Sequence, residues 1–161
     1  MVKKYKPARI IELGTSLGIS AAYLAKADPQ TEVITIEGSP EIAKLAAENF
    51  KTLGIQNIIQ RTGDFNQVLP ELLNDQEAGL VFIDGNHRYE PTVRYFEWIL
   101  PHTGDDSILI FDDIHWSPEM EKAWAAISAH PSVTCSIDLF FLGMIFFRSE
   151  FREKQEFRVR F

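Results

Sequence analysis

Residues 9–20 read Arg-Ile-Ile-Glu-Leu-Gly-Thr-Ser-Leu-Gly-Ile-Ser, and this segment says more about the fold than any other part of the chain. A short apolar run ends in an acid, the chain turns on Gly14 and Gly18, and a helical pattern follows from Ser20. Gly14 removes the side chain where the strand turns, and Gly18 allows a close approach at the start of the helix. The segment therefore predicts a strand, a tight turn and a helix N-terminus, which is a geometry that brings backbone close to a nucleotide-like ligand.

The turn lacks two of the three glycines of a dinucleotide-binding loop. That fingerprint reads G-x-G-x-x-G, and after Gly14 the two later positions hold Ser16 and Ile19. The loop therefore favours a ligand without a pyrophosphate. A nicotinamide-dependent oxidoreductase, which would share the turn and an acid at Glu37, is the weaker alternative, and a glycine turn that serves only packing is another.

Length and composition indicate one globular domain over residues 1–161. The apolar fraction of 45% and the charged fraction of 24% are typical of such domains. No apolar run approaches the ~18 residues that span a bilayer, and the N-terminus lacks the apolar core of a secretion signal. Cys135 is the single cysteine, so no internal disulfide can form. We therefore expect a cytoplasmic protein with no membrane partner.

Charge is unevenly distributed along the chain. The net charge is −7, but residues 10–147 hold 7 basic and 20 acidic side chains, a balance of −13. Such a body repels phosphate backbones. We therefore expect no nucleic-acid partner, whereas a cationic ligand or a metal would suit the acidic surface.

Strand and helix patterns alternate along the chain. The expected parallel strands are residues 8–13, 32–37, 57–61, 79–84 and 107–112. The expected helices are residues 20–27, 39–54, 66–73, 91–100 and 117–130. Two of them open on Ser-Pro-Glu, a serine cap followed by proline at the first helical position. On the helix at 39–54, one apolar face is formed by Ile42, Leu45, Ala46 and Leu53.

Two more strands, at residues 133–139 and 143–147, follow the last helix. Too few residues separate them for a crossover helix, so they pair antiparallel or lie apart. Phe157, Val159 and Phe161 alternate with arginines and predict one further strand. The predicted fold class is α/β, a Rossmann-like doubly wound sheet of five parallel strands plus an antiparallel terminal pair, with helices on both faces.

Acids stand at five successive strand ends. They are Glu12, Glu37, Asp64, Asp84 and Asp112, the last followed by Asp113. Ligands of an open α/β sheet lie beyond the carboxyl ends of its strands. Carboxylates crowded there cost stability unless cations or donors face them. For any single acid, capping of the next helix is an equal alternative.

Glu37 and Asp64 are candidates for holding a nucleoside. Glu37 lies about twenty residues beyond the glycine turn, the spacing at which an acid reaches a ribose diol. Asp64 could accept from an adenine amino group while Phe65 packs beside the ring. The alternatives are that Glu37 is a polar strand end before a cap at Ser39, and that Asp64 caps the helix at Asn66.

The later acids form a second candidate group. Asp84, Asp112 and Asp113 offer three hard oxygen ligands, which suit Mg²⁺ or Ca²⁺. His87 and His115 flank them, and either could serve as a general base near neutral pH. The alternative for each histidine is a plain hydrogen bond to a carboxylate.

With these residues in place, the chain resembles the class I S-adenosylmethionine-dependent methyltransferases. Among them it is similar to the metal-dependent small-molecule O-methyltransferases of the catechol and caffeoyl-CoA type. The likeness covers nearly the whole chain, with residues 12–18 as the cofactor loop. It implies that S-adenosylmethionine is held by Glu12, Gly14, Ser16, Gly18, Glu37, Gly38, Asp64, Phe65 and Asp84. It also implies a metal, Mg²⁺ or Ca²⁺, at Asp84, Asp112 and Asp113, where Asp113 replaces the asparagine usual in the family.

The resemblance implies methyl transfer to a hydroxyl of a small molecule. Asp84 and the metal would activate that hydroxyl. His87 is the first candidate for taking its proton, and His115 is the second. The implied partner is a small hydroxylated acceptor, and a homodimer is compatible with the resemblance. The main alternative is a domain of this fold that only binds the cofactor or a partner protein. Methylation of nucleic acid or of amide nitrogen would instead favour an Asn/Asp-Pro-Pro-Tyr-like turn at residues 84–87, which read Asp-Gly-Asn-His.

The start of the chain departs from the family pattern. Relatives of this type usually carry several helices before the first strand, whereas here the first strand is expected by about Ala8. The family's N-terminal helices are thus expected to be absent. Either the acceptor site is unusually open, or the chain is a shortened version of a longer protein.

Overall fold

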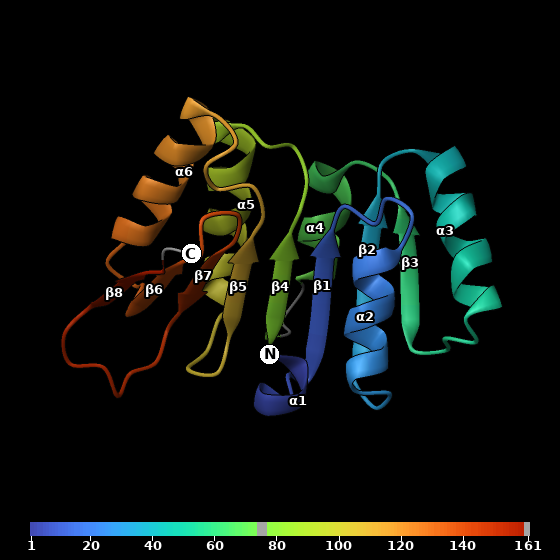
Figure 1. Cartoon of the computed structure of the whole chain (residues 1–161), viewed down its shortest axis with the longest axis horizontal. Coiled ribbons are helices and arrows are strands. Elements are labelled where there is room, and N and C mark those ends of the chain that lie inside the picture. The colour runs from blue at the N-terminus through green and yellow to red at the C-terminus, as the bar shows by residue number, and fades with distance from the viewer. Residues whose placement is uncertain (74–76, 160–161) are drawn as a thin grey trace. The chain divides into compact units, whose positions relative to one another are not determined.

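The computed structural model describes residues 1–73 and 77–159. The chain divides into two compact units, Met1–Gln76 and Glu77–Phe161. Both units combine strands with helices (Figure 1), and the predicted Rossmann-like α/β class is confirmed. Within the described ranges, no helix is both long and apolar enough to cross a membrane.

The first unit contains three parallel strands in the order β3-β2-β1. Their bounds are β1 Arg9–Leu13, β2 Glu32–Glu37 and β3 Ile58–Thr62. In register, Arg9 lies opposite Glu32, and Val33 lies opposite Ile58. All five residues of β1 are buried. Such burial on both faces is typical of strands in parallel sheets, and in β1 it includes the charged Arg9 and Glu12.

The helices of the first unit lie on both sides of these strands. Their bounds are α1 Val2–Tyr5, α2 Ile19–Ala27, α3 Pro40–Thr52 and α4 Phe65–Leu72. In Figure 1, α2 lies in front of β2 and α4 lies behind the strands, and both helices contact β2. The carboxyl ends of the three strands therefore stay open for the loops that follow them.

The buried face of α3 differs from the predicted one. Its buried residues are Ala43, Ala46 and Phe50. Three of the four residues predicted on the apolar face are exposed, namely Ile42, Leu45 and Leu53. The prediction was wrong for these three because small alanines face inward, leaving room for the Phe50 ring beside alanines of α2.

The second unit contains five strands in the order β4-β5-β7-β6-β8. Their bounds are β4 Leu80–Ile83, β5 Ile108–Phe111, β6 Cys135–Asp138, β7 Gly143–Phe146 and β8 Gln155–Arg158. β4 and β5 are parallel, β7 is antiparallel to both β5 and β6, and β8 is parallel to β6. The antiparallel pair and the additional strand are thus confirmed. The additional strand was predicted to begin at Phe157, whereas β8 begins at Gln155. The last residue of the prediction, Phe161, lies outside the described residues.

The helices α5 (Tyr89–Ile99) and α6 (Pro118–Ala129) pack against each other (Figure 1), and a short 3-10 turn, Leu100–His102, follows α5. Trp124 of α6 contacts Phe111 of β5, with ring centroids 6.4 Å apart. A Cβ on Gly143 of β7 would lie 2.5 Å from the Trp124 ring. Glycine at this position therefore allows α6 to sit directly on β5 and β7.

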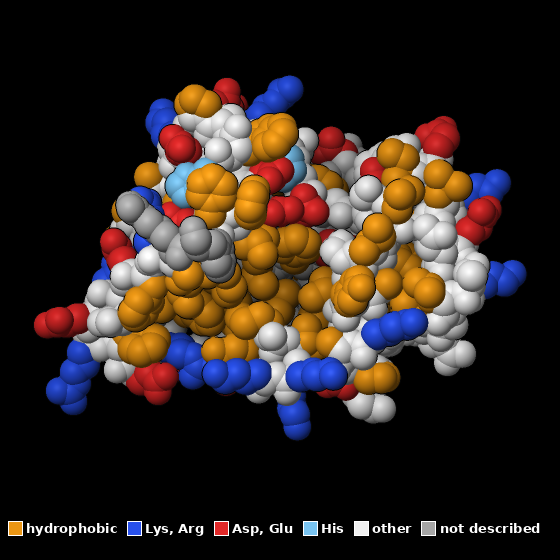
Figure 2. Space-filling view, viewed as in Figure 1, with side chains coloured by type: hydrophobic (Ala, Val, Ile, Leu, Met, Phe, Trp, Pro, Cys, Tyr) orange, Lys and Arg blue, Asp and Glu red, His pale blue; other side chains and the backbone are white. Residues whose placement is uncertain are grey.

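The other face of these strands carries a row of apolar side chains. Phe82, Ile110, Met144 and Ile137 are neighbours in register and are half-buried. Figure 2 shows apolar side chains gathered over β5 and β7 on this face. The alternation of residues along each strand therefore separates a helix-covered face from a more open one.

Both serine–proline helix starts form as predicted. The Ser39 hydroxyl accepts from the Ile42 backbone N–H at 3.4 Å, and the Ser117 hydroxyl accepts from the Met120 N–H at 3.2 Å. In α3 and α6, proline occupies the first turn, where its missing N–H costs nothing.

Candidate functional site

The turn after β1 has the backbone that its glycines predict. Gly14, Ser16 and Gly18 have φ angles of 108°, 47° and 81°, all in the left-handed region. Gly18 is the N-cap of α2, and a Cβ there would lie 2.4 Å from the Phe50 ring. Only glycine therefore lets the start of α2 approach α3 this closely.

Glu12 lies beneath the loop and is fully buried. The Thr35 hydroxyl donates to Glu12 Oε2 at 2.5 Å, and the Thr15 hydroxyl lies 2.6 Å from that of Thr35. Because the Thr35 proton goes to the carboxylate, Thr15 must donate to Thr35. Through these hydrogen bonds, Glu12 fixes the position of Thr15 in the glycine loop. The sequence reasoning missed both threonines, although a threonine inside the apolar strand at 32–37 was a visible signal.

Glu37 joins the glycine loop to the start of α3. Its Oε2 accepts from the Ser16 backbone N–H at 2.9 Å, and its Oε1 accepts from the Ser39 N–H at 3.0 Å. A carboxylate offers about four acceptor positions, so two remain for donors of a ligand. A Cβ on the neighbouring Gly38 would meet nothing within 4 Å. This corner is therefore open to a ligand.

Asp64 is the N-cap of α4. Its Oδ1 accepts from both the backbone and the side-chain nitrogen of Asn66, each at 2.7 Å. The capping alternative is therefore confirmed for this oxygen. Asp64 is exposed and Phe65 is half-buried, so both side chains are accessible.

Backbone hydrogen bonds bring the three strand ends of the first unit together. Gly14 and Thr15 donate to the Ile36 carbonyl at 3.0 and 3.1 Å, and Gly63 donates to the Glu37 carbonyl at 2.9 Å. The first unit therefore contains eight of the nine residues predicted to hold the cofactor: Glu12, Gly14, Ser16, Gly18, Glu37, Gly38, Asp64 and Phe65. The ninth, Asp84, belongs to the second unit.

In the second unit, His87 lies among the predicted aspartates. Its Nε2 is 3.5 Å from Asp84 Oδ1 and 3.9 Å from Asp113 Oδ2. Asp112 accepts from the backbone N–H of Asp113 at 2.9 Å. We call His87, Asp84, Asp112 and Asp113 the acid–histidine cluster. It brings a base and three acids to the ends of β4 and β5.

The charges of this cluster shift two pKa values. The hydrogen bond to Asp84 raises the pKa of His87, burial opposes the rise, and the charges of Asp113 and the other aspartates add to it. Burial raises the pKa of Asp112, and the charge of Asp84 adds to that effect. A raised pKa makes His87 a stronger proton acceptor.

The cluster does not fit the metal that the resemblance implies. In residues 1–73 and 77–159, no three His, Cys, Asp or Glu side chains are placed to hold an ion. Mg²⁺ and Ca²⁺ need several oxygens that converge on one point. Here Asp84 Oδ1 faces His87, and Asp112 Oδ1 accepts from the backbone N–H of Asp113. No step proposed below is therefore assigned to a metal.

His115 makes a different set of contacts. Its Nε2 lies 3.0 Å from Asp138 Oδ2, and its Nδ1 lies 3.4 Å from Glu121 Oε1. Both ring nitrogens are therefore engaged by carboxylates, as the hydrogen-bonding alternative predicts. Asp138 lies 23 residues further along the chain, so no local sequence pattern indicates this pair.

Asp138 supplies a pH-dependent prediction. Burial raises the pKa of this carboxyl, but the Phe140 N–H, His115 and Arg158 together outweigh it and lower the pKa. Because the pKa is lower in the folded state, the ionised carboxyl stabilises the fold at pH values above the unfolded pKa of about 3.9. This stabilisation is lost as the pH falls through the pKa of the folded state. Asp138→Asn should therefore lower the free energy of unfolding by roughly 1–3 kcal/mol near neutral pH.

Urea denaturation checks this prediction. The difference between the wild type and Asp138→Asn should shrink below about pH 4. Asp106→Asn is the control, because that side chain is 83% exposed. A difference for Asp138→Asn that stays constant down to acid pH would rule out the charged form as its source.

The strand–loop–helix at residues 9–27 and the acids at the strand ends define a Rossmann-like α/β protein. The chain belongs to the methyltransferase-domain family, because the model of that family matches residues 11–114. The family expected from the sequence is therefore confirmed.

Named relatives agree with this assignment. Catechol O-methyltransferase of Niastella koreensis is 33% identical over 110 residues, which cover 65% of this chain and 48% of the relative. The enzyme of the same name from Mycobacterium tuberculosis is 31% identical over 66% of this chain and 48% of its own length. An O-methyltransferase from Bacillus cereus, solved in complex with SAH, has a TM-score of 0.76 at 22% identity, and the match covers 90% of this chain and 76% of that one. The chain thus spans about half the length of the curated relatives named here.

Proposed function

We propose that the chain is an S-adenosylmethionine-dependent O-methyltransferase that acts on a hydroxyl of a small molecule. One observation carries the proposal. Glu37 is bonded to the glycine loop at the strand edge of a methyltransferase-domain chain, with acceptor positions still open. The relatives named catechol O-methyltransferase support hydroxyl oxygen as the target.

The first unit would hold the nucleoside part of the cofactor. Glu37 would accept from the ribose hydroxyls with the positions that Ser16 and Ser39 leave open. Asp64 would accept from the adenine amino group, and the accessible Phe65 ring would pack beside the base. The buried bonds among Glu12, Thr35 and Thr15 would keep the loop in place without touching the ligand.

The second unit would supply the base. When bound, S-adenosylmethionine provides an electrophilic methyl group, so the protein has to position the acceptor and remove its proton. His87 would take the proton from the acceptor hydroxyl. Asp84 would orient the imidazole and stabilise the imidazolium that forms, because its Oδ1 lies 3.5 Å from His87 Nε2.

A cofactor-binding domain without transfer is the second candidate. It is favoured by the coverage of 48% of each catechol O-methyltransferase relative. Such a domain would bind S-adenosylmethionine and form no S-adenosylhomocysteine with any acceptor.

Methyl transfer to a panel of catechols, other phenols and sugars distinguishes the candidates. We expect S-adenosylhomocysteine to form with at least one hydroxylated acceptor, at the same rate with EDTA as with Mg²⁺. Binding of the cofactor without product would favour the second candidate. Activity that appears only with Mg²⁺ would assign Asp84, Asp112 and Asp113 to a metal and overturn the role given to His87.

A further inference from the structure

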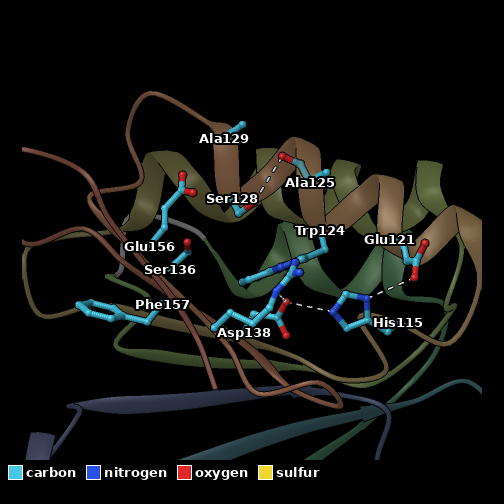
Figure 3. A pocket seen from close by; sticks show the side chains of 11 residues that line it. His115, Glu121, Trp124, Ala125, Ser128, Ala129, Ser136, Asp138, Glu156 and Phe157 are labelled. Carbon is cyan, nitrogen blue, oxygen red and sulfur yellow. Dashed lines mark hydrogen bonds and ion pairs between the residues drawn. The ribbon is translucent and has the colours of Figure 1, made fainter. Parts of the chain in front are cut away.

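A cavity of about 810 Å³ lies between α6 and the strands β6 and β8 (Figure 3). Its size falls within the range of small-molecule pockets, roughly 300–1,000 Å³. The α6 side is formed by small residues, Ala125, Ser128 and Ala129. Because these side chains are short, the space between the helix and the strands stays unfilled. We call this space the α6 cavity.

At one end of the α6 cavity, the polar side chains bond to one another. Asp138 accepts from Arg158 Nε at 2.9 Å and pairs with His115 at 3.0 Å. His115 in turn faces Glu121. Figure 3 shows His115 between Asp138 and Glu121. The Asp138 carboxylate at this end is therefore already paired within the chain.

The other end has open polar groups. Ser136 is only 5% exposed, and within the described part of the chain its hydroxyl makes no hydrogen bond. Glu156 lies beside Ser136 in the register of β6 and β8, and no cation in residues 1–73 or 77–159 pairs with its carboxylate. Figure 3 shows both side chains turned toward α6. Both groups can therefore bond to a ligand that enters this end of the cavity.

We propose that the α6 cavity binds a small primary amine with an apolar body, of the arylalkylamine class. An ammonium group carries three donors and no acceptor. It can therefore bond to the Glu156 carboxylate and to the Ser136 hydroxyl together, and the bond to the carboxylate is charge-assisted. The apolar body lies against Trp124, Ala125 and Ala129. An anion of the same shape meets the charge of Glu156 and is rejected.

Titration with phenethylamine tests the proposal on the whole chain saturated with S-adenosylhomocysteine, so that the proposed cofactor site is already occupied. We expect saturable shifts in the amide NMR signals of Ala125, Ala129, Ser136 and Glu156, and none with phenylacetate. Glu156→Gln should weaken binding about tenfold, which is typical for loss of a hydrogen bond to a charged group. Glu153→Gln, which makes the same charge change outside the cavity, should leave the affinity unchanged.

A second variant tests the volume of the cavity. Ala129→Phe places a ring in the space and should abolish binding, while the thermal midpoint shows whether the variant still folds. Equal binding of phenylacetate, or a Glu156→Gln variant that binds phenethylamine as the wild type does, would overturn the proposal. Shifts confined to residues outside the cavity would do the same. Because Glu156 is exposed, its variant is expected to fold even if Ala129→Phe does not.

Discussion

Asp84→Asn should lower the rate of methyl transfer by about 10²–10⁴-fold, the range for loss of positioned acid–base catalysis. Asparagine keeps the shape of the side chain but removes the charge that raises the pKa of His87. The imidazole then has a weaker affinity for the acceptor proton and loses the partner that stabilises its charged form. Cofactor affinity should change little, because the other eight predicted cofactor residues lie in the first unit.

The rate of S-adenosylhomocysteine formation and the calorimetric affinity for S-adenosylmethionine measure the two effects separately. Asp106→Asn serves as the matched control, since it removes one exposed aspartate of the same unit. If Asp84→Asn weakened both quantities equally, Asp84 would belong to the cofactor site and not to the base.

Glu37→Gln should weaken S-adenosylmethionine binding by roughly 10–100-fold, which corresponds to the loss of hydrogen bonds to a charged acceptor. Glutamine has one acceptor oxygen, whereas Glu37 accepts from the N–H groups of both Ser16 and Ser39. One of these donors would lose its partner, so the loop would lose its fixed position. The ribose hydroxyls would lose a charged acceptor as well.

Isothermal calorimetry on the folded variant measures this loss. Glu48→Gln makes the same change on an exposed position of α3 and should bind as the wild type does. An unchanged affinity in Glu37→Gln would show that Glu37 only shapes the loop. The strand-end alternative would then describe this residue completely.

Features set by neighbouring residues could be predicted from the sequence. Ser39 and Ser117 cap their helices because a serine hydroxyl needs only the N–H three residues ahead. The left-handed turn at Gly14 and Gly18 likewise follows from residues within one segment. The positions of the strands along the chain follow from short apolar runs, and the antiparallel pair follows from the short connection between its strands.

Features set by distant residues could not be predicted. The inward face of α3 depends on space beside Phe50 and α2, which favours alanine over the larger Ile42 and Leu45. The sequence analysis groups His115 with Asp112 and Asp113 because these three residues are close in the sequence. In the fold it bonds to Asp138, which the chain brings back through β6.

The predicted metal group depends on how carboxylates from two strand ends are placed in space. Three aspartates near two strand ends supply enough oxygen ligands for a metal ion. A metal site also requires that these oxygens converge on one point. Asp112 instead satisfies the N–H of Asp113, whose φ of 55° turns the backbone. Residue types alone do not predict whether carboxylates on two strands converge.

Calorimetric titration of S-adenosylmethionine into the chain, without added metal, tests the central claim most directly. The account predicts saturable binding at one site per chain, displaced by S-adenosylhomocysteine and not by NAD. Binding of NAD with no heat from S-adenosylmethionine would contradict it.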